Sequence, residues 1–155
     1  MYYVFCDGGA APTNPGPTAC GVVIRTPEGS TRELAKFCGH GTNQTAELDA
    51  AILGLVSVPE GADVILTSDS QYVIKGISEW RKGWEARGWR NANKKPISNK
   101  DRWLTLFGLV DKRNVNCNWV RGHNGHPENE RCDSMVTDAL ISHGYITNSD
   151  EQPGS

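Results

Sequence analysis

The sequence predicts a single α/β domain built on a mixed sheet, in which an antiparallel hairpin is followed by parallel strands. The length of 155 residues fits one domain better than two. The first third of the chain holds three strand-like segments separated by turn residues, and the remainder alternates between helical and strand patterns. This order implies helices packed on the sheet and right-handed crossovers between its parallel strands.

The first strand is expected at residues 2–6, an apolar and aromatic run that ends at Asp7 and two glycines. Residues 10–17 contain three prolines and a glycine, which is typical of a loop.

The second and third strands are expected at residues 20–25 and 31–37, where they flank a turn at residues 27–30. Two strands joined by so short a turn form an antiparallel hairpin. We expect the glycines of the sequence Gly39-His40-Gly41 to end the third strand.

Helical and strand patterns then alternate. Thr42 or Asn43 can cap a helix that runs to about residue 58, with apolar side chains at helical spacing. Residues 64–68 form a continuous apolar run of the kind found in buried parallel strands. Asp69 or Ser70 is then expected to cap the next helix.

The last part of the chain repeats this alternation after a basic segment at residues 80–95. Residues 99–112 carry apolar side chains on one helical face, and residues 115–120 alternate like a strand. A polar loop leads to Pro127, which suits the first turn of a helix that ends near residue 142. Residues 147–155 are polar, and we expect a flexible tail there.

The charge of the chain is balanced in total but unevenly distributed. There are 16 basic and 18 acidic residues, giving a net charge of −2. Residues 80–95 hold six of the basic residues and one acid, so a basic lobe stands on an otherwise acidic body. This asymmetry indicates a binding site for a polyanion.

The same composition argues against several classes of protein. No apolar run approaches the roughly 18 residues that a membrane span needs, and the N-terminal residues lack the pattern of a secretory signal. The five cysteines are an odd number without a Cys-x-x-Cys pair, which favours reduced, buried thiols in a reducing compartment. We therefore expect a cytoplasmic protein without a membrane partner, acting as a monomer.

Four acidic residues stand at positions from which they could converge. Asp7 and Asp69 follow predicted strands, whereas Glu47 and Asp133 lie in the first two turns of predicted helices. Carboxyl ends of neighbouring parallel strands open into one crevice, and carboxylates gathered there repel one another unless a divalent cation sits among them. Oxygen ligands favour Mg²⁺ or Mn²⁺, and a pair of such ions is typical of phosphodiester cleavage. The alternative is that these acids are helix caps and solvated surface residues.

Three neighbouring residues receive other interpretations. Asp49 is two residues from Glu47 and so points to a different side of the helix, which assigns it to solvent. His123 lies between glycines and could move protons near a phosphodiester, although a plain surface histidine is the commoner case. His126, just before Pro127, is expected to be structural or capping.

The basic lobe also carries aromatic side chains. Trp80 and Trp84 are four residues apart and would stack on one helix face, where they could contact sugars and bases while cations meet phosphates. Alternatively, the rings pack the lobe against the body, which is the interpretation we prefer for Trp89, Trp103 and Trp119.

Several further polar and basic side chains could contact nucleic acid. The cations with the strongest local charge are Arg90, Lys94 and Lys95. Polar loop residues able to bind sugar hydroxyls and phosphates, or merely to cap helices and turns, are Asn14, Thr42, Asn43, Gln44, Gln71 and Asn99.

Five stretches combine these residues in a recognisable order. They are Asp7-Gly8-Gly9 with Asn14-Pro15-Gly16-Pro17, Thr42-Asn43-Gln44-x-x-Glu47, Thr67-Ser68-Asp69-Ser70-Gln71-Tyr72-Val73, Arg87-Gly88-Trp89 with Lys94-Lys95-Pro96, and Trp119-Val120-Arg121-Gly122-His123-Asn124-Gly125-His126-Pro127-Glu128-Asn129-Glu130-Arg131-Cys132-Asp133. Together they closely resemble cellular ribonuclease H of type 1, in its bacterial form.

The resemblance implies a ribonuclease H-like fold, a five-stranded mixed sheet with helices on both faces, over a catalytic domain at residues 1–146. It implies an endoribonuclease that hydrolyses the RNA strand of an RNA–DNA hybrid and leaves 5′-phosphate and 3′-hydroxyl ends. Asp7 would bridge two Mg²⁺ ions, for which Mn²⁺ could substitute. Asp133 would hold the ion that activates water, and Glu47 and Asp69 the ion at the leaving 3′ oxygen.

The resemblance also implies roles for the remaining candidates. His123 would assist proton transfer or product release. The residues facing the RNA strand, where the 2′-hydroxyl distinguishes RNA from DNA, would be Asn14, Asn43, Gln44 and Gln71. Thr42 and Asn99 would clasp a phosphate of the DNA strand, Trp80 and Trp84 would line its channel, and the basic lobe with Lys94 and Lys95 would supply the grip.

Two other functions remain open from the sequence. One is a catalytically silent module that binds hybrids, against which the complete set of four acids argues. The other is a DNA nuclease or transposase-type domain on the same scaffold, against which the polar RNA-facing set and the tryptophan-rich lobe argue.

Overall fold

The computed structural model of the protein describes residues 1–122 and 125–146. Five strands form one sheet in the order β3-β2-β1-β4-β5. The strands are β1 (Tyr2–Ala10), β2 (Gly16–Arg25), β3 (Thr31–Gly41), β4 (Asp63–Ser68) and β5 (Asn114–Trp119). β1, β2 and β3 pair antiparallel, whereas β4 runs parallel to both β1 and β5. The predicted mixed sheet, with a hairpin followed by parallel strands, is confirmed.

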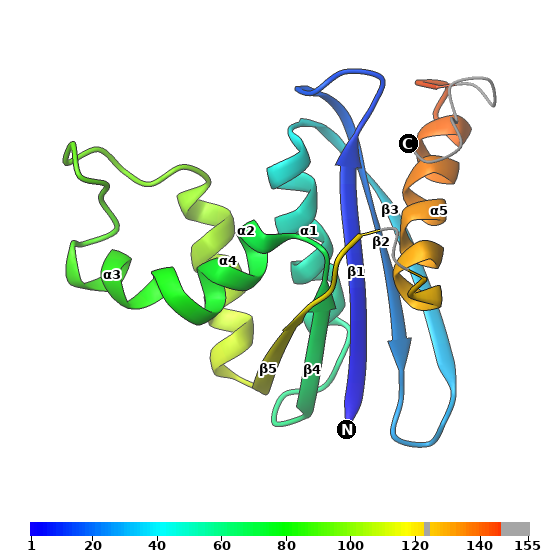
Figure 1. The fold of residues 1–155 in the computed structure, drawn as a ribbon, viewed down its shortest axis with the longest axis horizontal. Coiled ribbons are helices and arrows are strands. Elements are labelled where there is room, and N and C mark those ends of the chain that lie inside the picture. The colour runs from blue at the N-terminus through cyan, green and yellow to red at the C-terminus, as the bar shows by residue number, and fades with distance from the viewer. Residues whose placement is uncertain (123–124, 147–155) are drawn as a thin grey trace.

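Helices cover both faces of the sheet. The helical segments are α1 (Asn43–Val56), α2 (Gln71–Lys75), the π-helical segment η1 (Gly76–Trp80), α3 (Arg81–Ala86), α4 (Lys100–Asp111) and α5 (Pro127–Ser142). Figure 1 shows α1 and α4 on one side of the sheet and α5 on the other. The segment α2–η1–α3 leads away from the sheet into a lobe at the left of the view.

Alternation along the strands builds two hydrophobic layers. On the α1 and α4 side, Val4 and Val22 pack with Leu48, Trp103 and other buried residues in the larger core. On the α5 side, smaller clusters form around residues of β1, β2 and α5. Because successive side chains of a strand point to opposite faces, a two-sided strand such as β2 is buried along almost its whole length.

The helix starts agree with the capping residues in the sequence. The Thr42 hydroxyl accepts a hydrogen bond from the Thr45 amide at 3.1 Å, and the Thr45 hydroxyl accepts one from the Thr42 amide at 2.9 Å, forming a reciprocal cap on α1. Of the two candidates for the cap of α2, it is Ser70 whose hydroxyl accepts from the Val73 amide. Pro127 opens α5 as predicted.

The first three strands are longer than predicted, and two expectations were wrong. β1 does not end at Asp7 but continues to Ala10, because Asp7 and Gly8 pair with Gly21 and Cys20 of β2. The segment Gly39-His40-Gly41 does not break β3 either. Gly39 has a φ of 80°, and a shift in the pairing register next to Thr18 absorbs it as a β-bulge, after which β3 continues to Gly41.

The limits of the domain remain a prediction. Residues 1–146 form one sheet with its covering helices, apart from residues 123 and 124, which are not described. The predicted tail at residues 147–155 lies outside the described residues. Within the described ranges, no helix is long and apolar enough to cross a membrane.

Candidate active site

Two carboxylates meet where the parallel pairing of β1 and β4 stops. The last parallel pair joins Phe5 to Thr67. Asp7 and Asp69 each lie two residues beyond that pair, Asp7 within the continuing β1 and Asp69 directly after the end of β4. Residues two apart along a strand share a face, which brings both carboxylates into the opening at the carboxyl end of β4.

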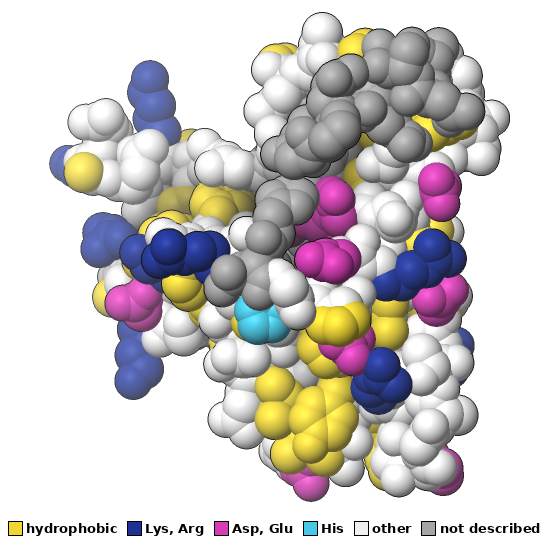
Figure 2. All heavy atoms as spheres, turned by 45° about the vertical axis from the view of Figure 1, so that its right-hand side comes forward, with side chains coloured by type: hydrophobic (Ala, Val, Ile, Leu, Met, Phe, Trp, Pro, Cys, Tyr) yellow, Lys and Arg dark blue, Asp and Glu magenta, His cyan; other side chains and the backbone are white. Residues whose placement is uncertain are grey.

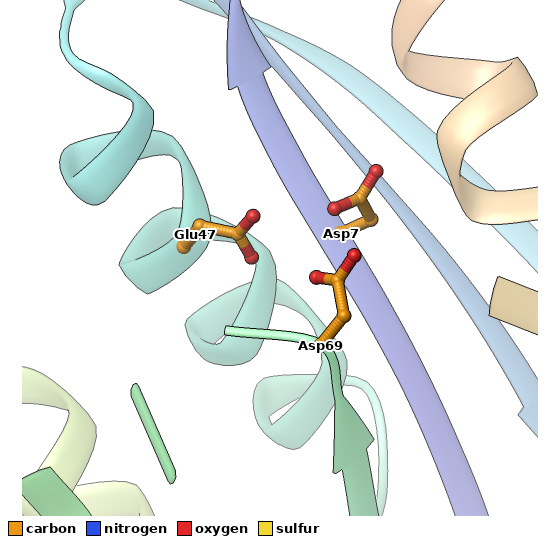
Figure 3. A group of neighbouring side chains, drawn as sticks. All are labelled: Asp7, Glu47 and Asp69. Carbon is orange, nitrogen blue, oxygen red and sulfur yellow. The ribbon is translucent and has the colours of Figure 1, made fainter. Parts of the chain in front are cut away.

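Helix α1 supplies a third carboxylate. Glu47 lies in the second turn of α1, which packs across β1 on one face of the sheet. One oxygen each from Asp7, Glu47 and Asp69 fall within 4.8 Å of one another. Figure 3 shows the three carboxylates pointing toward one another from β1, α1 and the segment after β4.

The close approach of α1 to β1 depends on a glycine. A Cβ atom at Gly8 would collide with the backbone carbonyl of Ala46, the residue before Glu47. A side chain at this position would therefore push α1 away from β1 and withdraw Glu47 from Asp7. The local sequence marks Gly8 only as a residue after a strand, because its packing role depends on the long-range contact with α1.

The electrostatics of this cluster disfavour three simultaneous charges. Burial, followed by repulsion from Asp69 and Asp133, raises the pKa of Asp7 from 3.8 to about 8. Burial and repulsion from Asp7 and Asp69 also raise the pKa of Glu47 well above its ordinary value. Both pKa values are raised by burial and by repulsion from neighbouring carboxylates. The metal-free site therefore retains protons at a pH where ordinary carboxyls have lost them.

Asp133 reaches the same group from the opposite side of the sheet. It lies in the second turn of α5, and its charge and its hydrogen bond with Asp7 both raise the pKa of Asp7. Asp133 does not belong to the compact group formed by the other three carboxylates. Glu47 and Asp133 therefore approach Asp7 from the two helical layers.

An unpaired buried oxygen indicates that the group is built for a cation. Glu47 Oε2 is fully buried and has no hydrogen-bond partner, although a buried polar atom without a partner is costly. A divalent ion held by oxygen ligands would satisfy this atom and neutralise the mutual repulsion. The residues present therefore fit a hard divalent metal ion.

The end of β4 is fixed by a tryptophan. Trp119 Nε1 donates a hydrogen bond to the backbone carbonyl of Asp69 at 2.9 Å, and the indole is 39% exposed. The expectation that Trp119 packs the lobe against the body is therefore wrong, because its ring stands at the end of β5 beside the cluster. Sequence reasoning missed this role, since nothing in a local pattern shows which carbonyl an indole will reach.

The neighbouring acids and histidines differ in their positions. Asp49, which we assigned to solvent, accepts a hydrogen bond from Arg102 Nε at 2.9 Å and is only partly exposed, so this expectation was wrong. His126 occupies the N-cap position of α5, but its side chain makes no capping hydrogen bond. His123 lies outside the described residues.

The polar candidates lie around the start of α1, where several are held by hydrogen bonds. Asn43 Oδ1 accepts from the Ala10 amide at 2.8 Å, and Asn14 Oδ1 accepts from the Asn43 amide at 3.0 Å. These bonds tie the loop after β1 to α1. Gln44 and Gln71 are exposed at the first turns of α1 and α2.

A tyrosine joins the lobe to the body. The Tyr72 hydroxyl accepts hydrogen bonds from Asn99 Nδ2 at 3.1 Å and from Trp103 Nε1 at 3.0 Å. Asn99 is the N-cap residue of α4, in a left-handed backbone conformation. Sequence reasoning predicted Asn99 as a phosphate ligand and overlooked Tyr72, whose position beside both residues comes from the tertiary fold.

Three tryptophan rings contact one another in series from the surface to the core, each tilted against the next rather than stacked on it. Trp80 is 37% exposed and lies 5.8 Å from the ring of Trp84, which in turn lies 5.0 Å from the fully buried Trp103. Trp89 packs on Phe107. Trp103 and Trp89 thus pack the lobe against the body as predicted, while Trp80 offers an accessible ring at the surface end of the series.

Basic side chains stand apart from the acidic cluster. Lys94 and Lys95 are exposed in the loop after α3, and Arg90 Nη1 holds this loop by donating to the Lys94 carbonyl at 3.0 Å. Figure 2 shows acidic side chains near the centre of the face and several basic side chains over the lobe to its left. The surface therefore combines a negative site with a neighbouring positive region.

Comparison with known proteins gives a consistent result. The model of the RNase H family matches residues 1–141. The chain is 46% identical over 140 residues to the ribonuclease H of Syntrophotalea carbinolica, covering 90% of this chain and 91% of that protein. It is 47% identical over 134 residues to the ribonuclease H of Alkalilimnicola ehrlichii, covering 86% and 90%.

Solved structures resemble the fold as well. LC9-RNase H1, a type 1 RNase H with the type 2 active-site motif, superposes with a TM-score of 0.78 at 25% identity, covering 95% of this chain and 74% of that one. LC11-RNase H1, solved in complex with an RNA/DNA hybrid, superposes with a TM-score of 0.70 at 22% identity, covering 92% and 99%. The second likeness concerns the fold alone.

Proposed function

Because this chain belongs to the ribonuclease H family, we propose that Asp7, Glu47, Asp69 and Asp133 form its metal-binding active site. As a member of this family it is a metal-dependent endoribonuclease that cleaves the RNA strand of RNA–DNA hybrids. The observation that carries the assignment of the site is the convergence of three carboxylates within 4.8 Å, one with a buried, unpaired oxygen.

Two Mg²⁺ ions are the proposed cofactors, with Mn²⁺ as a substitute. Asp7 would contact both ions, Asp133 would hold one of them, and Glu47 and Asp69 would hold the other. When bound, the ions would supply activation of the attacking water and stabilisation of the leaving 3′ oxygen, and the products would carry 5′-phosphate and 3′-hydroxyl ends. The position of Asp7 supports its proposed contact with both ions. Its carboxylate lies close to those of Glu47 and Asp69, and the charge of Asp133 raises its pKa.

The protein supplies the shape and the charge of this site. β1 and the end of β4 hold Asp7 and Asp69 on rigid backbone, and the hydrogen bond from Trp119 fixes the Asp69 carbonyl. The raised pKa values of Asp7 and Glu47 mean that loading the site displaces protons. His123 is proposed to assist proton transfer or product release, as the resemblance of the chain to its family implies.

Contacts to the hybrid are proposed on both sides of the acidic group. Asn14, Asn43, Gln44 and Gln71 would face the RNA strand, and the linked loop of Asn14 and Asn43 supports this grouping. Thr42 and Asn99 would hold a phosphate of the DNA strand, with Trp80, Trp84, Lys94 and Lys95 along its path. Phosphate and sugar contacts carry no base code, so we expect little sequence preference.

Two further proposals concern the location and the oligomeric state of the protein. We propose a cytoplasmic location, which suits five cysteines that are all free thiols in the structure. We also propose that the enzyme acts as a monomer, because a single chain supplies all four carboxylates.

The function is tested by incubating the protein with a labelled RNA–DNA hybrid, an RNA duplex and a DNA duplex, each with Mg²⁺ or with a chelator. Only the hybrid should be cleaved, only in its RNA strand, and only with metal, leaving 5′-phosphate ends. Binding of the hybrid without cleavage would instead indicate a silent module. Cleavage of the DNA duplex would indicate a DNA nuclease on the same scaffold.

A further inference from the structure

Two cysteine sulfurs lie next to each other away from the active site. Cys20 Sγ and Cys38 Sγ are 3.3 Å apart, on the neighbouring strands β2 and β3. Cys20 is completely buried on the α1 side of the sheet, whereas Cys38 is only partly buried and packs at the margin of the same core. Nothing in the proposed hydrolysis of hybrids uses either thiol.

The bulge in β3 gives this pair its geometry. Thr18 pairs with Gly39 and Ala19 pairs with Phe37, so Cys38 has no partner in β2. A bulged residue lacks ladder hydrogen bonds and its backbone can adjust more readily than that of a paired residue. The sulfurs must approach from 3.3 Å to the roughly 2.05 Å of a disulfide, a shift of about 1.2 Å.

The surroundings of Cys38 favour its thiolate. A hydrogen bond with Cys20 lowers the pKa of Cys38, an effect to which the positive charges of Lys36 and Arg102 add, while burial and the charge of Asp49 oppose it. Burial raises the pKa of Cys6, Cys117 and Cys132. Since the thiolate is the reactive form, Cys38 is the thiol of this chain best suited to react first.

We propose that Cys20 and Cys38 form a reversible intrachain disulfide when the protein meets a peroxide. Cys38 is the thiol that reacts with the oxidant, and Cys20 is the buried partner that resolves it. The disulfide would link β2 to β3 on the side of the sheet covered by α1. This modification site is additional to the proposed hydrolytic function and does not rest on it.

Oxidation of the two thiols to a disulfide needs one peroxide as its only oxidant. The Cys38 thiolate attacks one peroxide oxygen, the O–O bond breaks, and the departing hydroxide takes a proton to become water, leaving a sulfenic acid on Cys38. The Cys20 sulfur then attacks the sulfenic sulfur, the S–O bond breaks, and hydroxide leaves as water with the proton of the Cys20 thiol. Two thiols lose two electrons in total, and one peroxide becomes two waters.

The first test counts thiols and maps the bond in the full-length chain. After treatment with hydrogen peroxide, the number of free thiols measured in denaturant should fall by two from five, and dithiothreitol should restore them. Trypsin separates the two cysteines, because Arg25, Arg32 and Lys36 lie between them. Mass spectrometry without reduction should therefore find residues 1–25 joined to residues 37–75. Because Cys6 shares the first of these peptides with Cys20, fragmentation of the joined peptides should place the bond at Cys20 and not at Cys6.

Two variants provide the control. Cys38→Ser should keep its remaining thiols under the same treatment, whereas Cys117→Ser, which removes another partly buried strand cysteine, should still form the Cys20–Cys38 bond. Because a cross-link restricts the unfolded chain, oxidised wild-type protein should also melt at a higher temperature than reduced protein, and Cys38→Ser should not.

Three results would overturn the proposal. One is wild-type protein that keeps all its thiols under peroxide, and another is a bond that joins two chains or a different cysteine pair. The third is an equal loss of thiols in Cys38→Ser. None of these readouts depends on metal or hybrid, so they are separate from the test of the nuclease function.

Discussion

Asp7 and Asp69 lie in equivalent positions relative to the last parallel pair of the sheet, each two residues beyond Phe5 and Thr67. From that point β1 continues alongside β2, while β4 ends and the chain turns into α2. The divergence opens the space that Glu47 enters from α1 and Asp133 approaches from α5. The site is thus a consequence of one strand ending where its neighbour continues.

Replacing Asp7 by Asn should remove cleavage of the hybrid while leaving the fold intact. The amide keeps the shape of the side chain but removes the charge that all three other acids surround, so we expect a loss of more than about 100-fold in kcat. Gel-based cleavage with circular dichroism on the same samples measures both properties. Asp138→Asn, on an exposed position of α5, should retain full activity. Metal-dependent cleavage by Asp7→Asn at the wild-type rate would exclude the shared role of Asp7.

The metal-free protein should lose stability as the pH rises. The pKa of Asp7 in the folded protein is about 8 rather than 3.8, so the folded state holds its proton more tightly than the unfolded state does. This stabilisation is fully present below pH 3.8 and is lost as the pH rises through about 8. Melting temperatures measured in the presence of a chelator should therefore fall as the pH rises from about 4 to about 8.

The Asp7→Asn variant is the control for this pH dependence. It lacks the titrating carboxyl and also relieves Glu47 of repulsion, so its melting temperature should fall less over the same range. Saturating Mg²⁺ should flatten the wild-type curve as well. If the melting temperatures of wild-type protein and of the variant change equally with pH, the burial of Asp7 and Glu47 has no consequence for stability.

Gly8→Ala and Gly108→Ala should have opposite effects. A methyl group at Gly8 meets the Ala46 backbone and must displace α1, which we expect to cost about 1–3 kcal/mol and to lower kcat through Glu47. At Gly108, in an exposed part of α4, a methyl group meets nothing within 4 Å and should stabilise the helix by about 1 kcal/mol. Chemical denaturation of both variants measures the difference. Equal free energies of unfolding would contradict the close packing of β1 and α1.

Replacing Lys94 and Lys95 by Ala should weaken binding of the hybrid rather than its cleavage. We expect a higher KM, an unchanged kcat, and a salt dependence of KM reduced by roughly 0.9 for each phosphate that is no longer neutralised. KM measured at several salt concentrations provides the slope. Lys112→Ala removes an exposed lysine that pairs with Glu60 at the other end of the sheet, and it should leave the slope unchanged. If all three proteins give the same slope, the lobe does not contact phosphates.

Local signals in the sequence were sufficient for much of the framework. Thr42 and Pro127 mark the starts of α1 and α5, and the apolar runs at residues 2–6 and 64–68 lie in the two central parallel strands. Acids placed after strands and in first helical turns did converge, because parallel strands expose their carboxyl ends at one edge. Position alone left open whether these acids converge or cap helices and face solvent, and it is the neighbouring placement of β1 and β4 that brings Asp7, Glu47 and Asp69 together.

Features set by tertiary contacts were beyond the reach of local patterns. Asp7, Gly8 and Gly9 have poor strand propensity, yet pairing with β2 keeps them in β1. The bulge at Gly39 preserves β3 where a glycine normally ends a strand. The partners of Asp49 and Trp119 are 53 and 50 residues away in the sequence, so no local pattern could reveal them.

The most direct test of the central claim is calorimetric titration of Mg²⁺ into the metal-free protein near pH 7, in two buffers of different ionisation enthalpy. If the ions relieve repulsion among buried carboxyls, wild-type protein should release about one proton on binding, because the pKa of Asp7 is about 8 in the metal-free site. Asp7→Asn should bind more weakly and release fewer protons. Identical heats in both buffers, with equal affinity in the variant, would contradict the account.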